Sequence, residues 1–368
     1  MILPPWKLVA DLLNPWKPLP WDILHVFGPM CLAIVPLLPL FYLRSVKIYV
    51  SYHVYLNFYK KIYLTNPIVS FLIEWIFSVL YFIPFVMWAD VVGIPSHTAD
   101  SLVFDYAKRI HVMKSGLQTD VFKPLDKEIS LSPWNHLVSK RSGPTLVYVG
   151  RLAAEKNVEF LINALSHEKL NHYTLVLVGD GPSRKSLERL ASCIVGKGNV
   201  FSRMRNQDYT LDDCEDSSRA RVVFTGMVHS EHFVAQHYGH ADIFVSASAS
   251  ETFGFTVAEA MACGIPAVVV RSGAFETVYS CISDWMFSPN ETEDYVNKLV
   301  DVVSLGPGAR QVARHYAIQQ FGVDRAVDDL LAVYQMVLTN KYLAPVKINS
   351  SAYNWEALRL DLNQKKIY

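Results

Sequence analysis

Short apolar runs alternate with segments of helical spacing from residue 144 onwards. The apolar runs are rich in Val, Leu and Ile, which is typical of parallel strands whose two faces are both covered by helices. The alternation therefore predicts a doubly wound α/β domain. The predicted strands are "TLVYVG", "YTLVLVGDGP", "RVVFTGMV", "ADIFVSAS" and "PAVVVRSG", and the predicted helices are "VEFLINAL", "RKSLERLAS", "EHFVAQHYGH" and "TVAEAMACG".

Three stretches depart from this alternation. Residues 123–143 are polar and contain prolines, which predicts a linker. Residues 196–219 are polar and charged, and we expect a surface loop without chemistry there. The chain has helical spacing over residues 309–338 and no clear pattern beyond them. The expected organisation is an N-terminal domain over 1–122, a linker over 123–143, the doubly wound domain over 144–307, and C-terminal helices with a tail over 308–368.

The first 122 residues are rich in aromatic and apolar residues. Strands are predicted in "WDILHVFGP", "SVKIYVSYHVY", "ADVVGIP" and "IHVMKSG", which together predict the back half of a second Rossmann-like domain. Residues 68–88 approach the roughly 20 apolar residues that a membrane span needs, but Glu74 and Pro84 interrupt them. We interpret this stretch as a buried or interfacial helix, with a transmembrane span as the alternative.

Composition excludes several classes of protein. The chain has 368 residues, of which 51% are hydrophobic, and this is ample for two medium domains. The formal net charge is +0, which offers no electrostatic reason for a nucleic-acid partner. The five cysteines are scattered without a CxxC pair, so neither a zinc site nor a disulfide framework is indicated. The first residues lack the uninterrupted apolar core of a signal peptide.

Two cations follow the first strand of the doubly wound domain. Arg151 and Lys156 stand in the loop and first helical turn after "VYVG". Cations beside the free N–H groups of a helix N-terminus form an anion site. A solvated basic pair at a helix start is the alternative interpretation of these two residues alone.

The stretch "ASETFGFTVAEAMACGIPAVV" follows the fourth strand and places Glu251 and Glu259 on either side of a predicted helix start. Gly254 allows close backbone approach to a ligand, and the N–H groups of Gly254, Phe255 and Thr256 are expected to face a diphosphate. Carboxylates suit the recognition of sugar hydroxyls. We also expect Phe253 and Phe255 to shield the site and Thr256 to cap the helix. The alternative makes both glutamates ordinary surface residues.

Two other patterns carry less chemistry. "VLVGDGP" lacks the GxGxxG spacing of a dinucleotide site and predicts a tight turn after the second strand. The histidines of "HSEHFVAQHYGH" lie around one predicted helix, and a structural or solvent role is preferred to a metal site.

The stretches "GRLAAEK", "VGDGP", "FTGMV" and "SETFGFTVAEAMACGIPAVV" resemble, in order and spacing over residues 145–270, the donor domain of GT-B retaining glycosyltransferases with the E-x7-E motif. Upstream, "SYHVYLNFYKKIY", "ADVVGIPSHTADSL" and "MKSGLQTDVFKP" resemble plant and algal sulfoquinovosyltransferases, which use a UDP-sugar and diacylglycerol. The resemblance implies an α/β GT-B fold in which two Rossmann-like domains face a cleft.

The resemblance also implies roles for particular residues. Arg151 and Lys156 would hold the donor diphosphate, and Glu259 would bind the ribose hydroxyls. Glu251 would hold the donor sugar with the backbone of residues 253–256. His53 would reach the sugar from the opposite domain, so Glu251 and His53 are the expected catalytic residues.

Met227 and Val228 would lie near the nucleotide base. The implied partners are a nucleotide sugar, a lipid acceptor such as diacylglycerol and a membrane surface, with no nucleic acid. No cofactor and no metal ion are expected, and the sequence has no Asp-x-Asp metal motif.

This chain departs from the sulfoquinovosyltransferase pattern in a few places. Tyr55 stands where the family has a second histidine, and "RSGAFETV" replaces the usual Gly-Gly-x-Pro turn. In the family the N-terminal domain begins roughly a hundred residues earlier, about half the length of a typical domain. The resemblance therefore implies an incomplete N-terminal domain, as in a truncated gene model or a fragment.

The function expected from the sequence is retaining transfer of a sugar, sulfoquinovose, from UDP-sulfoquinovose to diacylglycerol in a chloroplast. One alternative is a mannosyl- or glucosyltransferase that acts on another lipid or glycan. Another is a non-catalytic remnant that lacks the first half-domain. The chloroplast location is implied by the resemblance alone, since no transit peptide is visible. The alternative location is the cytoplasmic face of a membrane.

Overall fold

The computed structural model describes residues 5–28, 32–53, 66–77, 83–96, 107–125, 134, 143–204, 207–210 and 219–339. The chain folds into two compact units. Unit 1 contains the described residues up to Ser115 and those from Asp324 onwards, and unit 2 contains the described residues from Gly116 to Val323. Each unit has a sheet and a core of its own.

The sheet of unit 2 contains the five strands that the apolar runs predict. They are β5 (Thr145–Val149), β6 (Thr174–Val178), β9 (Arg221–Gly226), β10 (Ile243–Ser246) and β11 (Ala267–Val270), and β12 (Met286–Phe287) extends the sheet at one edge. All pairings among these six strands are parallel. Their apolar side chains are buried on both faces, which is why the sequence shows continuous rather than alternating apolar runs.

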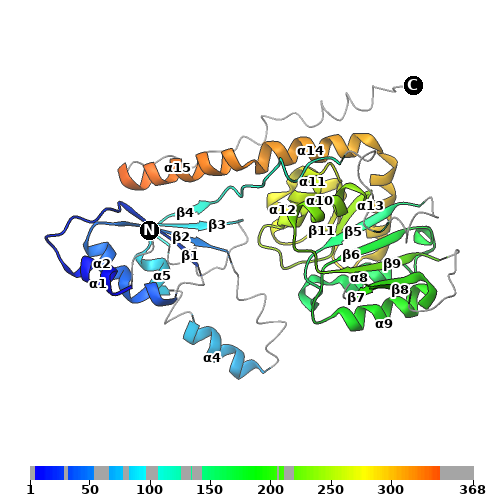
Figure 1. The fold of residues 1–368 in the computed structure, drawn as a ribbon, viewed down its shortest axis with the longest axis horizontal. Coiled ribbons are helices and arrows are strands. Elements are labelled where there is room, and N and C mark those ends of the chain that lie inside the picture. The colour runs from blue at the N-terminus through cyan, green and yellow to red at the C-terminus, as the bar shows by residue number, and fades with distance from the viewer. Residues whose placement is uncertain are drawn as a thin grey trace. The chain divides into compact units, whose positions relative to one another are not determined.

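Helices cover both faces of this sheet, with α10, α11 and α14 on one side and α8 and α9 on the other (Figure 1). The four predicted helices of this domain are confirmed, and the structure adds α12 and α13 after β11. The bounds are α8 (Val158–Ala164), α9 (Arg184–Val195), α10 (Glu231–Gly239), α11 (Phe255–Ala262), α12 (Ala274–Val278), α13 (Thr292–Ser304) and α14 (Pro307–Phe321). Single 3₁₀ turns lie at Ala154–Lys156, Glu168–Leu170, Lys197–Asn199 and Ser280–Trp285.

The strand order of unit 2 is β12-β11-β10-β5-β6-β9-β7-β8, in which the two further strands are β7 (Val200–Met204) and β8 (Gln207–Thr210). The chain therefore runs outward from β5 through β6 to β7 and β8, returns with β9 between β6 and β7, and then crosses to the other side of β5 with β10. β5 and β10 are neighbours, but the chain continues from β5 to β6 on one side of this pair and from β10 to β11 on the other side. Ligands of open α/β sheets bind at this kind of switch point, outside the carboxyl ends of the strands.

The prediction of a surface loop over residues 196–219 was wrong. Two strands lie in this stretch, β7 (Val200–Met204) and β8 (Gln207–Thr210), which pair in antiparallel fashion. β7 also pairs with β9 and so extends the sheet. The apolar Val200 and Phe201 of β7 are buried against the core. An edge strand such as β8 can be polar, and its polar sequence is why a loop was predicted there.

Trp134 is the only described residue inside the predicted linker apart from its two ends, residues 123–125 and 143. Its side chain is buried and its ring packs against His237 at a centroid distance of 5.0 Å. This position therefore belongs to the core of unit 2.

Unit 1 has a parallel sheet of four strands in the order β1-β2-β3-β4. The four predicted strands are confirmed as β1 (Ile23–Gly28), β2 (Lys47–Tyr52), β3 (Val91–Ile94) and β4 (Ile110–Val112). The other elements of the unit are α1 (Pro5–Leu13), a 3₁₀ helix (Leu32–Leu37), α2 (Leu38–Leu43), α4 (Pro67–Phe77), α5 (Ile83–Trp88) and α15 (Val323–Thr339).

The helix α15 packs on the sheet of unit 1, although it follows α14 of unit 2 in sequence. Val333 and Val337 pack on Tyr49 of β2. The Tyr334 hydroxyl lies 2.6 Å from Nδ1 of His25, and burial, with a smaller effect of His53, lowers the pKa of His25 to about 4. His25 is therefore a neutral, structural side chain near neutral pH.

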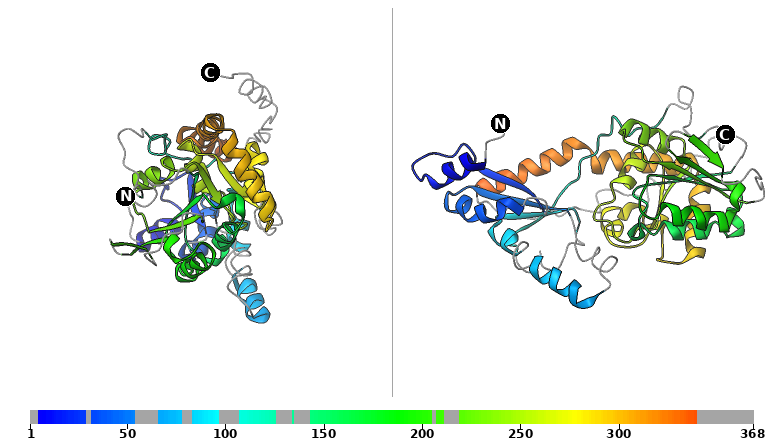
Figure 2. Two further views of the ribbon diagram at one scale, coloured as in Figure 1. Left: turned by 90° about the vertical axis from the view of Figure 1, so that its right-hand side faces the viewer. Right: turned by 60° about the horizontal axis from the view of Figure 1, so that its bottom comes forward.

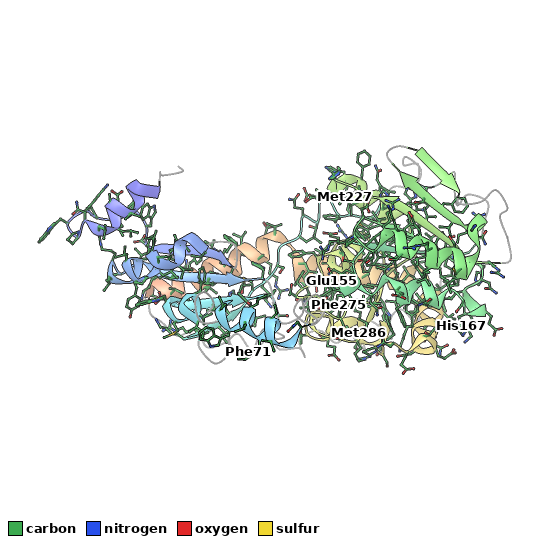
Figure 3. All side chains as sticks on the ribbon, turned by 90° about the horizontal axis from the view of Figure 1, so that it is seen from below. Phe71, Glu155, His167, Met227, Phe275 and Met286 are labelled. Carbon is green, nitrogen blue, oxygen red and sulfur yellow. The ribbon has the colours of Figure 1, made fainter. Side chains whose placement is uncertain are left out.

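The helix α4 exposes most of its apolar side chains. In unit 1 it lies apart from the sheet (Figures 1 and 2), and Figure 3 labels Phe71 on it. Its exposed large side chains have exposed fractions between 44% and 70%; they are Ile68, Val69, Phe71, Leu72, Ile73, Trp75 and Ile76. Among the described residues, no helix reaches the length and hydropathy that crossing a membrane requires.

Candidate functional site at the switch point of unit 2

Two contacts join the loops that follow β5 and β10. The Lys156 ammonium donates to Oε1 of Glu251 at 2.6 Å. The Ser250 hydroxyl donates to the backbone carbonyl of Glu155 at 3.2 Å. The structure therefore brings together two residues that the sequence analysis selected from separate motifs. They meet at the switch point because β5 and β10 are neighbours in the sheet.

Arg151 is the second cation of the site. Its guanidinium pairs with the carboxylate of Glu155, whose side chain is buried, while the Arg151 side chain itself is 52% exposed. The Tyr148 hydroxyl donates to the Arg151 carbonyl at 3.0 Å. Burial raises the pKa of Tyr148, so this hydroxyl remains a donor at physiological pH. The exposed guanidinium is thus held by the buried carboxylate of Glu155, while the Tyr148 hydroxyl holds the backbone of the same residue.

The "GDGP" turn supports the loop that carries Arg151. Gly150 N donates to the Val178 carbonyl and Leu152 N donates to the Asp180 carbonyl, each at 3.0 Å. A Cβ at Gly179 would lie 2.0 Å from the Gly150 carbonyl oxygen. The turn predicted from this motif is confirmed, and its glycine provides room for the crossing loop.

The helix α11 begins with a glycine cap. Gly254 is the N-cap residue with φ 85°, a conformation that glycine adopts without strain. The first turn of a helix has N–H groups without an acceptor inside the helix, so the amides near Phe255 and Thr256 form a positive end. The prediction that Thr256 caps the helix was wrong, because α11 has no side-chain cap and Thr256 lies inside it.

The two phenylalanines have different environments. The Phe253 side chain is 4% exposed and packs against Tyr279 and Phe321 at ring centroid distances of 6.0 and 5.4 Å. The expectation that it shields a ligand was therefore wrong for its side chain, which is part of the core. Phe255 is 45% exposed and remains available for that role.

Glu259 lies in the second turn of α11. Its Oε2 accepts a hydrogen bond from the Tyr238 hydroxyl at 2.8 Å. Burial raises the pKa of Glu259, and the hydrogen bond from Tyr238 acts in the opposite direction. The sequence predicted the glutamate but not its partner, which lies on α10.

The remaining predicted residues lie in different places. Met227 and Val228 follow β9, with Met227 60% exposed and Val228 packed against the core; Figure 3 labels Met227 and also Glu155. His53 follows β2 in unit 1, where its ring stacks with Phe27 at 6.4 Å. A catalytic role for His53 therefore stays a prediction.

The histidines around α10 do not gather. His237 is buried and its Nδ1 lies 2.6 Å from the Phe233 carbonyl, whereas His229 and His232 are exposed. Among the described residues, no three His, Cys, Asp or Glu side chains come close enough to hold a metal ion. His237 therefore has the structural role predicted for this cluster.

Sequence reasoning missed four residues that position the site: Tyr148, Glu155, Tyr238 and Ser250. Glu155 stands beside Lys156 in "AAEKN", and its position four residues after Arg151 was a usable signal for an ion pair. Tyr238 gave no comparable signal, because its contact with Glu259 joins two helices.

Known proteins resemble this chain in sequence. Residues 143–304 match the family model described as "Glycosyl transferases group 1". The sulfoquinovosyl transferase SQD2 of Arabidopsis thaliana is 26% identical over 327 residues, 84% of this chain and 56% of that protein. The alpha-monoglucosyldiacylglycerol synthase of Streptococcus pneumoniae is 28% identical over 279 residues, 72% of this chain and 55% of that protein. The chain thus spans about half the length of these relatives.

Solved structures share the fold. Anabaena Alr3699/HepE in complex with UDP and glucose matches with a TM-score of 0.60 at 16% identity, covering 85% of this chain and 77% of that chain. Sucrose-phosphate synthase from Thermosynechococcus elongatus matches with a TM-score of 0.61 at 18% identity, covering 87% of this chain and 74% of that chain. The chain therefore has the GT-B fold, and its residues 143–304 match the family model of the glycosyl transferases group 1.

Proposed function

We propose that this chain is a glycosyltransferase that moves a sugar from a UDP-sugar to a lipid acceptor. The observation that carries the proposal is the ion pair of Lys156 and Glu251, which joins the two loops of the switch point. A cation for a diphosphate and a carboxylate for sugar hydroxyls thus lie side by side. Both are next to the positive end of α11.

In the proposed donor complex, Lys156 and Arg151 hold the diphosphate together with the amides of Gly254, Phe255 and Thr256. Diphosphate competes with Glu251 for the Lys156 ammonium, since both are anionic acceptors. Once displaced, the Glu251 carboxylate accepts hydrogen bonds from the donor sugar. Glu259 binds the ribose, Val228 lies near the base, and the Phe253 backbone completes the turn.

We propose that the transfer retains the anomeric configuration, because the spacing of Glu251 and Glu259 resembles that of retaining enzymes. The bond between the anomeric carbon and the diphosphate oxygen breaks, and the diphosphate leaves with the bonding electrons. Fixed cations and helix amides stabilise that developing charge without reorganisation. The acceptor hydroxyl oxygen then forms the new bond to the anomeric carbon on the same face, and its proton passes to the departing diphosphate oxygen. His53 is proposed to contact the sugar.

Two findings support a lipid acceptor. The names of two relatives, a sulfoquinovosyl transferase and a monoglucosyldiacylglycerol synthase, refer to glycosyl transfer, the second to diacylglycerol. In addition, α4 exposes seven large apolar side chains, and an exposed apolar surface of this kind is typical of a site that contacts a membrane or a partner. We propose diacylglycerol as acceptor and sulfoquinovose as sugar, with a chloroplast location if sulfolipid is the product.

The test offers the full chain UDP-sulfoquinovose, UDP-glucose and GDP-mannose in turn, with diacylglycerol in phosphatidylglycerol vesicles. We expect UDP release and a glycolipid with the donor's anomeric configuration, measured by mass spectrometry and NMR. Transfer from UDP-glucose or GDP-mannose alone would replace the sulfoquinovose assignment with a glucosyl- or mannosyltransferase. Binding of UDP without transfer from any donor would favour a non-catalytic remnant.

The lipid surface proposed for α4 has its own test. Phe71 and Trp75 stand four residues apart on α4 and are both exposed, so Phe71→Ser with Trp75→Ser should leave folding intact. Burial of each such side chain contributes about 2 kcal/mol. We therefore expect the double variant to cosediment with vesicles at least tenfold more weakly than the unmodified chain.

The matched control is Leu305→Ser, which removes an exposed apolar side chain from unit 2. It should cosediment like the unmodified chain. Equal vesicle binding by the α4 double variant would show that α4 does not contact lipid.

A further inference from the structure

Tyr238 connects the core of unit 2 to the candidate nucleotide site. Its side chain is fully buried near the end of α10. Its ring packs between Phe122 and Phe244, at centroid distances of 6.3 and 6.0 Å. Because the ring is packed in this way, the position of its hydroxyl is fixed. The hydroxyl donates to Oε2 of Glu259 at 2.8 Å.

This hydrogen bond leaves the other carboxylate oxygen of Glu259 available. Within the described part of the chain, Oε1 of Glu259 has no hydrogen-bond donor. A carboxylate that is anchored through one oxygen and open at the other has a defined orientation. It suits the recognition of hydroxyl groups whose position is fixed, because little conformational freedom is lost on binding.

The surroundings of Glu259 favour loss of its charge. Burial raises its pKa, and Glu231 on α10 raises it further, whereas only the hydrogen bond from Tyr238 is identified as lowering it. Cys263 on the same helix and Tyr279 after α12 have pKa values that are themselves raised by burial, so neither offers a charge. Arg314 of α14 binds the carbonyls of Phe122 and Ala262.

We propose that Tyr238 is a positioning residue that orients the Glu259 carboxylate toward the ribose hydroxyls of the nucleotide. This inference rests on the proposed function, because it takes a nucleoside diphosphate as the ligand. It assigns Tyr238 to discrimination of the ribose and not to binding of the diphosphate. The two parts of the nucleotide can therefore be tested separately.

The experiment measures binding of UDP and of 2′,3′-dideoxy-UDP to the full chain and to Tyr238→Phe by titration calorimetry. Hydrogen bonds to a charged group are among the stronger ones in proteins. We expect the variant to bind UDP about tenfold more weakly and to bind the dideoxy nucleotide as the unmodified chain does.

The pH dependence gives a second readout. Loss of the Tyr238 hydroxyl removes an interaction that lowers the pKa of Glu259, so the carboxylate of the variant becomes protonated at a higher pH. The variant's deficit in UDP binding should therefore be larger at pH 6 than at pH 8. A merely structural role of Tyr238 would reduce the binding of both nucleotides equally at all pH values.

Two further variants serve as controls. Tyr295→Phe removes the hydroxyl of another buried tyrosine, on α13, and should leave both affinities unchanged. In a Glu259→Gln background, Tyr238→Phe should have little further effect on UDP binding, because the two residues act through one contact.

The outcomes separate this inference from the proposed function. Unchanged UDP binding in Tyr238→Phe, or equal loss for both nucleotides, would overturn the inference while the proposed function stands. Failure of the unmodified chain to bind UDP, GDP or ADP would overturn the proposed function and this inference with it. If Tyr238→Phe does not fold, Glu259→Gln replaces it, and UDP binding as strong as that of the unmodified chain would overturn the inference.

Discussion

Replacing Arg151 by alanine is expected to lower kcat/KM for sugar transfer by a factor of about 100 or more, the typical effect of removing one preorganised group that stabilises transition-state charge. Arg151 is exposed towards solvent while Glu155 and Tyr148 hold it from behind. The guanidinium is therefore placed before the donor arrives. The change also leaves the Glu155 carboxylate without its cation, which adds negative charge near the diphosphate.

The measurement is steady-state transfer by the full chain at several donor concentrations. Arg189→Ala is the matched control, since Arg189 is an exposed arginine of α9 in the same unit. Its kcat/KM should match that of the unmodified chain. An Arg151→Ala variant as active as this control would contradict the proposed donor site.

Replacing Gly179 by alanine is expected to destabilise unit 2 by about 3 kcal/mol. The new Cβ would lie 2.0 Å from the Gly150 carbonyl oxygen, and both positions are backbone, so no flexible side chain can move aside. Gly179 also has φ 139°, which side chains rarely adopt. The clash would displace the loop that carries Arg151, so activity should fall together with stability.

Thermal unfolding measures this effect, with an expected fall in Tm of about 10 °C for a unit of this size. The control Gly196→Ala measures the cost of a positive φ without a steric clash. Gly196 has φ 86°, but nothing lies within 4 Å of the position its Cβ would take. That control should lose only about 1 kcal/mol. Equal Tm values for the two variants would show that Gly179 and the Gly150 carbonyl are not tightly packed against each other.

Each cation of the site pairs with a carboxylate, Arg151 with Glu155 and Lys156 with Glu251. The two acids differ in burial, since the side chain of Glu155 is 3% exposed and that of Glu251 is 21% exposed. Glu155 is therefore the fixed anchor of its cation. Glu251 is the acid that a diphosphate can displace, which agrees with its proposed role at the sugar.

Local patterns were sufficient for the central strands of unit 2 and the helices between them. The runs at β5, β6 and β9 are apolar because parallel strands are buried on both faces, and this composition can be recognised in sequence. The start of α11 could also be predicted from the local sequence, because Gly254 marks a backbone conformation that other residues disfavour. The edge strand β8 was not predicted, because one side of an edge strand faces solvent and its sequence can therefore be polar.

The contacts between site residues could not be predicted from sequence, because they join segments that are far apart along the chain. The sequence selected Lys156 and Glu251, but their 2.6 Å contact depends on β10 lying beside β5, which the strand order decides. Tyr238 and Glu259 meet for a similar reason, because α10 and α11 pack on the same face. Periodicity reports which side of an element is buried; it contains no information on which other element covers that side, and the partners of a site residue are chosen by that packing.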